Sequence, residues 1–463
     1  MKFQRISDWS RRHPATTGCL GLIFLIVALF VGFDCYSRIR LASEIRTLER
    51  MGIPCDIAEF EARQRKLGAS EKLTREFLSF CEAISLEESV PASPPAETVL
   101  FEPEELPKFL AGHGNEIRAA DRFLAEHPDL ILWRDCSADL LWDIPFPGLN
   151  QIRAYIRLNH DRFDCALQKN DPAEAARNFD RSAILRDYVL RDPFLLSLGL
   201  AHALENIRQR ALFKAALHGE IRQFDSATLK RWAESMPEVE TAFRTGWRLA
   251  WENELGCIVD CANHPQQLLR ITAGVSEPSS RLIGMVLSPF IRLDAATSAR
   301  MVREAVLPVG ELDDMSARVR RLRPYEEFLI SRRSKSACFA PVSKSLLLMT
   351  AAPLNETTSR IFARCRVVRT GLAVELFLRK YGRLPQKLDE LVPEFLPAVP
   401  VNPLSGNPLR FEAGTLEYTP AGSETVETYE GYRIVVDDSP SYSRADREEW
   451  FPEWNRAMKL NTP

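Results

Sequence analysis

Two cysteines and a histidine in the middle of the chain have an order that could bind a metal ion. The segment reads Cys257-x-x-x-Cys261-x-x-His264, with Asp260 between them. Zinc prefers such ligands, but a structural zinc site needs four, and no second cysteine pair follows. Cysteines four residues apart lie one turn apart on a helix, so we favour burial in a core, with a disulfide or a metal as the alternative. The sequence therefore predicts no metal and no cofactor.

Two tryptophans precede this segment at a helical spacing. Trp247 and Trp251 lie four residues apart, so both side chains occupy one face of a helix. They could form the aromatic wall of a binding groove, with charged residues on either side. A core stripe that packs on a neighbouring helix is the interpretation we favour. The charged neighbours are Arg244, Arg248, Glu252 and Glu254.

The densest basic run could contact an anionic partner. It comprises Arg318, Arg320, Arg321 and Arg323, followed by Arg332, Arg333 and Lys335. Such a run could meet anionic lipid, a cell-wall polymer or an acidic protein. Glu326 and Glu327 lie between the two groups, which favours a solvated face whose charges are paired internally.

Sequence signatures of catalysis are missing. The seven histidines are scattered, and there is no HExxH, GxSxG, GxxxxGK[ST] or GxGxxG segment. This favours a binding protein over an enzyme, although catalytic triads can be assembled from distant residues. The net charge of −3 gives no footprint for nucleic acid.

An apolar segment near the N-terminus predicts a membrane anchor. Thr16–Phe33 contains eighteen residues without a charge, about 27 Å of helix against a hydrocarbon core of roughly 30 Å. A buried core helix and a cleaved signal peptide are the alternatives, but no small-x-small cleavage site follows the segment. We therefore expect a cytoplasmic head at 1–15, an anchor at 16–36 and a body outside the cytoplasm. The short head and the large C-terminal mass favour that orientation.

The next region, 37–107, is expected to contain juxtamembrane helices and a linker. Gly52-Ile-Pro54 should break the helix that continues from the anchor. Asp56 and Glu59 form a capping box for the next helix, and Ser70 caps a further one. The proline-rich stretch Glu87–Pro107 is typical of a linker or an irregular surface wrap. Ten cysteines without a regular framework leave any disulfide pairing open.

Helical patterns dominate residues 108–350. Asp171-Pro172 and Asp192-Pro193 each place a capping residue before a proline at the first helical position. Ala175-x-x-x-Phe179 matches one element of the tetratricopeptide pattern, which suggests packing of that kind without a clear repeat. The expected helices are Asn150–Asn170, two that follow the Asp-Pro pairs, Ser226–Met236, Glu238–Asn263, Leu293–Val309 and Tyr325–Met349.

Residues 351–463 predict a small α+β module. Because the preceding residues are expected to be helical, the expected fold class of the whole chain is mainly α. A long helix, Thr357–Tyr381, should end at Gly382, and a short helix is expected over Leu384–Leu391. Three short strands with turns between them are expected at Leu409–Phe411, Leu416–Tyr418 and Tyr432–Val436.

The stretch FLRKYGRLPQKLDELVPEFLPAVPVNPLSGNPLRF, Phe377–Phe411, resembles the C-terminal region of the major pseudopilins of type II secretion. The matches are Gly382, Arg383 and Pro385, then Leu391, Val392 and Pro393, then Asn402, Pro403, Gly406, Asn407 and Pro408. The resemblance implies a long helix, a proline-punctuated loop and a small antiparallel sheet. It also implies a calcium loop, for which only Glu424, Glu427, Asp437 and Asp438 could offer carboxylates. A pseudopilin has a glutamate five residues into its membrane helix, and Thr16–Phe33 has none.

The whole arrangement also resembles a set of uncharacterised bacterial proteins with an N-terminal anchor, a following "GIP" segment, a helical middle and this end. We expect a membrane-tethered scaffold or interaction protein of the cell envelope, without catalytic activity. An anchored hydrolase with its site in the helical middle and a component related to a secretion or pilus machine are the alternatives.

Overall fold

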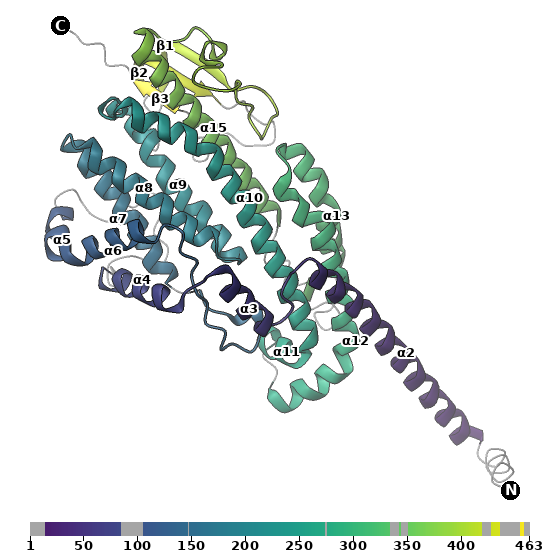
Figure 1. Ribbon diagram of the computed structural model, residues 1–463. Helices are drawn as coiled ribbons and strands as arrows, with labels where there is room; N and C mark the ends of the chain where they lie inside the picture. The colour runs from purple at the N-terminus through teal and green to yellow at the C-terminus, as the bar shows by residue number, and fades with distance from the viewer. Residues whose placement is uncertain are drawn as a thin grey trace.

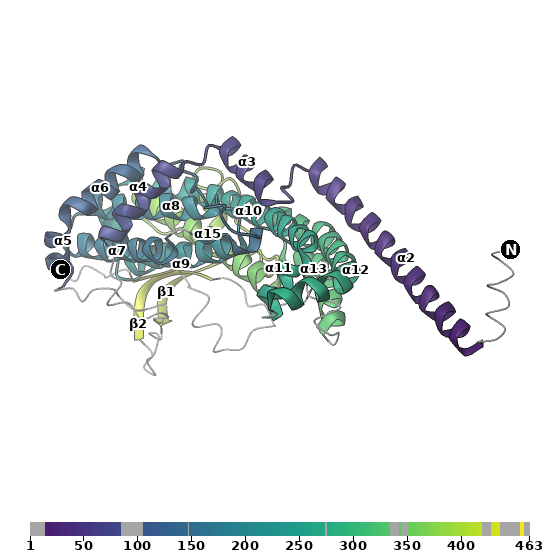
Figure 2. The same cartoon turned by 90° about the horizontal axis from the view of Figure 1, so that it is seen from below.

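The computed structural model describes residues 14–84, 105–146, 148–273, 276–333, 342–343, 351–418, 427–435 and 454–457. It is mainly helical, with a long N-terminal helix at one end and a small sheet at the other (Figures 1 and 2). The mainly α class is therefore confirmed for these residues. Most of the predicted linker, residues 87–104, lies outside them, as do Cys338, Glu424, Asp437 and Asp438.

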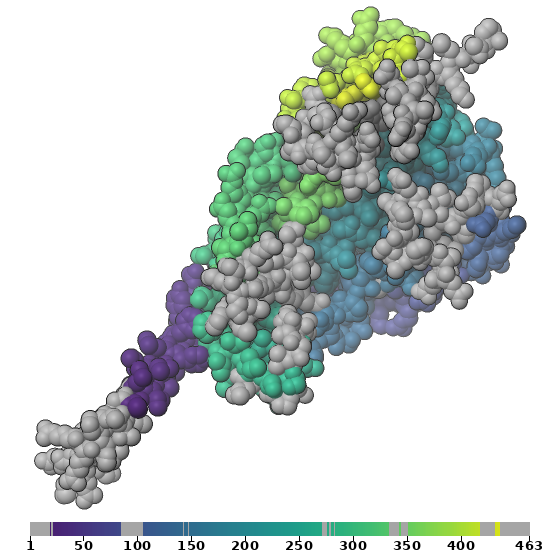
Figure 3. Space-filling model, turned by 180° about the vertical axis from the view of Figure 1, so that it is seen from behind, coloured from purple at the N-terminus to yellow at the C-terminus, as the bar shows by residue number. Residues whose placement is uncertain are grey.

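The first described helix, α2, spans Pro14–Arg50 and projects from the body as a stalk (Figure 3). It is long and apolar enough to cross a membrane, and only 6% of its most apolar window is buried inside the molecule. A core helix would have most of that window covered. The C-terminal half does pack on the body, through Ser37, Leu41 and Leu48 at steps of four and seven residues.

Local signals set the ends of the next helices as the sequence predicts. α2 ends before Gly52, whose φ of 72° suits glycine. The Asp56 side chain accepts a hydrogen bond from the Glu59 N–H and caps α3, Ile57–Leu67. Ser70 accepts from the Leu73 N–H in the same way and caps α4, Glu71–Ala83.

The helices α5–α9 form the first half of the body. Asp171 caps α8 through the Glu174 N–H, as predicted. Asp192 was expected to cap α9 but does not, because its carboxylate is bound by the buried Arg134 and the helix begins three residues later. Their bounds are α5 Leu106–Gly112, α6 Gly114–Glu126, η1 Leu141–Asp143, α7 Leu149–Gln168, α8 Pro172–Leu190, α9 Leu195–Leu217 and η2 Glu220–Gln223.

One long helix, α10 (Ser226–Asn263), runs through the centre of the molecule. Two helices with a break at Pro237 were predicted, and that break is wrong. A proline inside a helix costs about 3 kcal/mol, but Met236 and Val239 on either side are buried, so packing holds the helix together. At the other end, the absent side chain of Gly256 lets the Pro54 carbonyl approach, since a Cβ there would lie 2.1 Å from that oxygen.

Of the helices that follow α10, α12 packs on α2. Leu293–Val309 is helical as predicted. It is formed by the end of α12, a π-helical turn (η3) and the start of a 3-10 turn (η4). The helix predicted over Tyr325–Met349 starts too late, because the observed helix begins at Met315 and passes through Pro324. Residues 334–341 and 344–349 of that prediction lie outside the described residues. The bounds are α11 Pro265–Ala273, α12 Glu277–Met301, the π-helical η3 Val302–Val306, η4 Leu307–Glu311 and α13 Met315–Arg333.

The C-terminal part begins with α15, Ala351–Tyr381, which ends at Gly382 (φ 67°) as predicted. The expected short helix is reduced to a 3-10 turn, η5, Leu388–Leu391. The strands are β1 Arg410–Tyr418, β2 Glu427–Val435 and β3 Trp454–Ala457, in antiparallel order β1-β2-β3. The turn expected between residues 411 and 416 is wrong, because Gly414 continues the strand and pairs with Gly431.

One hydrophobic core joins these parts. It extends from Leu41 in α2 to Ile434 in β2, and α15 contributes Phe362, Val368 and Leu372 to it. The domain boundary predicted between residues 350 and 351 therefore divides helices that share a core, because α15 packs on α9 and α10.

A buried histidine marks the junction of these three helices. His202 of α9 is stacked on Phe243 of α10, with ring centroids 5.0 Å apart. Its Nε2 lies 2.8 Å from Oγ1 of Thr358 in α15. The same hydroxyl also lies within hydrogen-bond distance of the Leu354 carbonyl, at 2.8 Å. Burial lowers the pKa of His202 to about 3.

This histidine predicts a loss of stability in mild acid. In the unfolded chain His202 titrates near 6.5, so it contributes stability fully above pH 6.5 and less as the pH falls towards 3. At pH 5 the loss should be about 2 kcal/mol, a unit of pKa being worth about 1.4 kcal/mol. Urea unfolding of the wild type and of His202→Gln at pH 7 and pH 5 measures it. The variant should lose less stability between the two values, whereas His218→Gln, at the end of the same helix, should follow the wild type; equal slopes for all three would contradict the assignment.

Candidate functional site

The cysteines of the predicted metal segment lie in the core. Cys257 and Cys261 are 1% and 0% exposed, and both are free thiols. Asp260 accepts a hydrogen bond from the Leu141 N–H and lies 3.1 Å from Nδ1 of His264. No group of three metal-binding side chains is found within the described ranges. All nine cysteines in those ranges are free, and burial raises the pKa of Cys257 and Cys261.

Trp247 and Trp251 line no groove. Both are 0% exposed, and their ring centroids lie 5.8 Å apart. The Trp247 Nε1–H donates to the Val306 carbonyl, and Trp251 meets Tyr325 edge to face. The groove interpretation is thus wrong, because α13 and the turn before it cover this face of α10.

The basic run is divided by the fold. Arg318 is 0% exposed and donates to the Leu312 carbonyl and the Asn355 amide oxygen, so it belongs to no surface patch. Burial lowers its pKa to about 10. Arg320, Arg321 and Arg323 are exposed on α13, as predicted for a solvated face.

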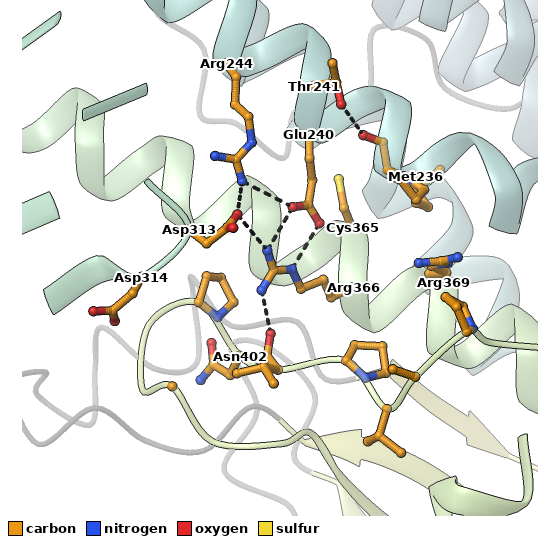
Figure 4. A pocket seen from close by; sticks show the side chains of 18 residues that line it. Met236, Glu240, Thr241, Arg244, Asp313, Asp314, Cys365, Arg366, Arg369 and Asn402 are labelled. Carbon is orange, nitrogen blue, oxygen red and sulfur yellow. Dashed lines mark hydrogen bonds and ion pairs between the residues drawn. The ribbon is translucent and has the colours of Figure 1, made fainter. Parts of the chain in front are cut away.

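A pocket with a charged lining lies between the body and the C-terminal part. Its volume is about 590 Å³, larger than the 440 Å³ cavity between α8 and α10. One wall is the Pro237 turn of α10, another is α15, and the third is the proline-rich loop 397–403 (Figure 4). Three arginines from two helices reach it: Arg244, Arg366 and Arg369.

Arg366 on α15 forms hydrogen bonds with both of the other walls of the pocket. Its guanidinium grips the Glu240 carboxylate with two hydrogen bonds of 3.1 and 2.9 Å. The remaining nitrogen donates to the Val401 carbonyl of the loop at 2.8 Å. A bidentate pair of this kind fixes both side chains and leaves the arginine with little capacity for a ligand.

Arg244 is also held by groups of the chain itself. It donates to the carbonyls of Gly310 and Leu312 and pairs with Asp313. The neighbouring Asp314 accepts from the backbone N–H groups of residues 316 and 317 at the start of α13. The pocket carboxylates therefore already have partners.

Arg369 differs from the other two arginines. Its side chain is half-buried at the rim of the pocket, three residues beyond Arg366 on α15. Among the residues that the structure describes, none forms a hydrogen bond or ion pair with it, and Figure 4 draws it without a dashed line. Burial lowers its pKa, and the charges of Glu240 and Glu234 oppose that effect only in part. A partly desolvated cation of this kind favours an anionic ligand.

The pocket offers no activated nucleophile within the described part of the chain. The Cys365 thiol behind its wall is 0% exposed and accepts a hydrogen bond from Gln209 at 3.2 Å. Burial raises the pKa of this thiol, which keeps it protonated. The hydroxyl of Thr241 donates to the Pro237 carbonyl, without a base beside it. The arrangement is suited to binding rather than to covalent chemistry.

The sequence alone had not singled out Arg366 and Arg369. The pattern Arg366-x-x-Arg369 interrupts a helix that is otherwise apolar over Val367, Val368 and Gly371–Val374. Two cations one turn apart in such a helix are a signal that could have been used. The third wall could not have been foreseen, because the loop lies about thirty residues further along the chain.

No family model matches the chain. No curated protein and no solved structure matches it either. The resemblance to the pseudopilins, the calcium loop and the tetratricopeptide-like packing therefore stay predictions.

Proposed function

We propose that this protein is a membrane-tethered scaffold of the cell envelope that holds an acidic segment of a partner protein in the pocket at Arg369. The α2 helix anchors the chain with its N-terminus in the cytoplasm, and the body lies outside. Such a scaffold requires no catalytic activity.

The guanidinium of Arg369, which has no hydrogen-bond or ion-pair partner among the described residues, is the observation that carries the proposal. Arg244 and Arg366 are held by carboxylates and carbonyls of the chain itself, so they build the pocket. Arg369 remains available to a carboxylate from outside. A charge-assisted hydrogen bond to such a group contributes about 1.5–3 kcal/mol.

The other lining favours an extended peptide as the carrier of that carboxylate. The loop wall is mostly apolar and includes Pro397, Val399, Pro400 and Val401, with Asn402 as its polar side chain, and Val401 is 41% exposed. Small apolar side chains beside one cation can hold an acidic residue together with its apolar neighbours.

Removal of Arg369 should abolish most of the binding to acidic peptides. The probe is an array of fluorescent peptides with Asp, Glu or a free C-terminal carboxylate, titrated against the full chain in detergent by polarisation. Arg369→Ala should weaken the best peptide by about 10- to 150-fold, the equivalent of one charge-assisted bond.

Arg323→Ala is the matched control, since it removes an exposed arginine of α13 that does not line the pocket. It should bind like the wild type. Equal weakening by both variants would indicate attraction by net charge alone, and no binding of any acidic peptide would reject the proposed ligand.

A further inference from the structure

The N-terminal half of α12 has an inverted distribution of polarity. Ser280 and Ser288, eight residues apart, are 1% and 6% exposed and face the interior. On the outer face, Ile283, Met285 and Val286 are 37%, 72% and 52% exposed. A helix on the surface of a water-soluble protein places its apolar side chains inward. Here three apolar side chains face outward, although Ser279 and Arg281 near the start of the helix are exposed too. The outer face beyond Arg281 therefore suits an apolar surrounding.

The small inner residues hold this half of α12 in a fixed orientation. Gly284 lies between the two serines and is buried too. A Cβ at Gly284 would lie 3.3 Å from the Gln266 Cα, so α11 and α12 pack with their backbones close together. The apolar side chains consequently cannot turn inward without losing that contact.

The same helix is attached to the stalk at the end of its apolar segment. Phe290 packs on Phe33, the last residue of that segment, with ring centroids 4.9 Å apart. Arg292 then donates to Asp34 at 2.6 Å, and Arg303 of η3, which directly follows α12, donates to Glu44 at 3.3 Å. Figures 1 and 2 both show α12 alongside α2. The exposed apolar face therefore lies beside the point where α2 would leave a bilayer.

We propose that the outer face of α12, formed by Ile283, Met285 and Val286, is embedded in the lipid bilayer next to α2. The inference rests on the proposed anchor, because the apolar segment of α2, exposed over Leu22–Val31, ends at Phe33, on which Phe290 of α12 packs. A second copy of the chain or another protein could also cover three apolar side chains. Lipid is favoured because it already surrounds the adjoining part of α2. Two contacts, α2 and α12, then fix the direction in which the body points from the membrane.

Photo-crosslinking in vesicles tests this contact directly. The full chain is reconstituted in vesicles of phosphatidylethanolamine and phosphatidylglycerol with p-benzoylphenylalanine in place of Met285, and lipid adducts are measured by mass spectrometry. The same label in place of Phe24 (75% exposed, in the apolar segment of α2) is the positive control. The label in place of Tyr381 (48% exposed, at the end of α15 beside the sheet) is the matched control at the opposite end of the molecule from the stalk (Figure 1).

We expect lipid adducts at Met285 comparable with those at Phe24 and about tenfold more abundant than those at Tyr381. Adducts at Phe24 without adducts at Met285 would overturn the inference and leave the anchor standing. The absence of adducts at Phe24 would overturn the anchor, and the inference with it. A Met285 crosslink to a second copy in place of lipid would show that the face is a protein interface.

Discussion

Replacing Glu205 by glutamine is expected to lower the free energy of unfolding by about 3–5 kcal/mol, the usual effect of breaking a buried ion pair on one side. The carboxylate is 0% exposed and accepts hydrogen bonds from Arg186 and Arg208 at 2.7–2.8 Å, and from Gln209 at 2.7 Å. Both arginines are also buried. Without the negative charge, two guanidinium groups remain in the core with one partly exposed counter-ion, Asp187.

Asp187→Asn is the matched control for this change. It removes a carboxylate from the same network, 2.6 Å from Arg186, but one that is 31% exposed. Water can replace much of its interaction, so the loss should be about 1 kcal/mol or less. Unfolding in urea, followed by tryptophan fluorescence, measures both variants. Equal losses would show that Glu205 does not act as the central counter-ion.

The same carboxylate contributes to acid sensitivity. Burial alone would raise the pKa of Glu205, but the charges of Arg208 and Arg186 outweigh burial and lower it to about 2. Its stabilisation is complete above the unfolded value of 4.5 and is lost as the pH falls towards 2. This window begins at a lower pH than that of His202 and overlaps it between about pH 4.5 and 3, where both residues lose stabilisation.

Replacing Arg134 by methionine should have an effect of similar size, again about 3–5 kcal/mol. Arg134 binds Asp192 through two hydrogen bonds of 2.7 and 2.5 Å, and both side chains are almost fully buried. Its guanidinium carbon also lies 4.4 Å from the ring centroids of Phe146 and Phe194. Methionine can fill much of that space, but it leaves the Asp192 carboxylate buried without its counter-ion.

The double variant Arg134→Met with Asp192→Leu separates charge from packing. If the uncompensated charge causes the loss, removal of both charges should restore stability to within about 1 kcal/mol of the wild type, as apolar replacements of buried pairs often do. The same urea experiment tests it. A double variant as unstable as the single one would assign the loss to packing against the two phenylalanines.

Local signals in the sequence determined much of the secondary structure. The Asp56 and Ser70 caps, the Asp171-Pro172 start and the Gly382 stop all depend on residues within a few positions of one another. An uninterrupted apolar segment likewise identified a helix able to span a membrane. The predictions failed where distant contacts outweighed a local rule, as at Pro237 inside α10 and at Gly414 inside β1.

Only the tertiary structure decided which charged residues are structural and which are available to a ligand. Arg318 resembles its neighbours in the sequence, but the fold buries it against α15 and leaves Arg320 in solvent. Arg366 and Arg369 are also the same residue type three positions apart. Of the two, Arg366 is the one that forms hydrogen bonds with the Glu240 carboxylate of α10. The pairing of Arg366 depends on a carboxylate 126 residues away in the sequence, and that of Arg318 on an amide 37 residues away. Desolvation then sets the energy of each charge. Spacing along the chain determines the helices, and the packing of those helices determines the site.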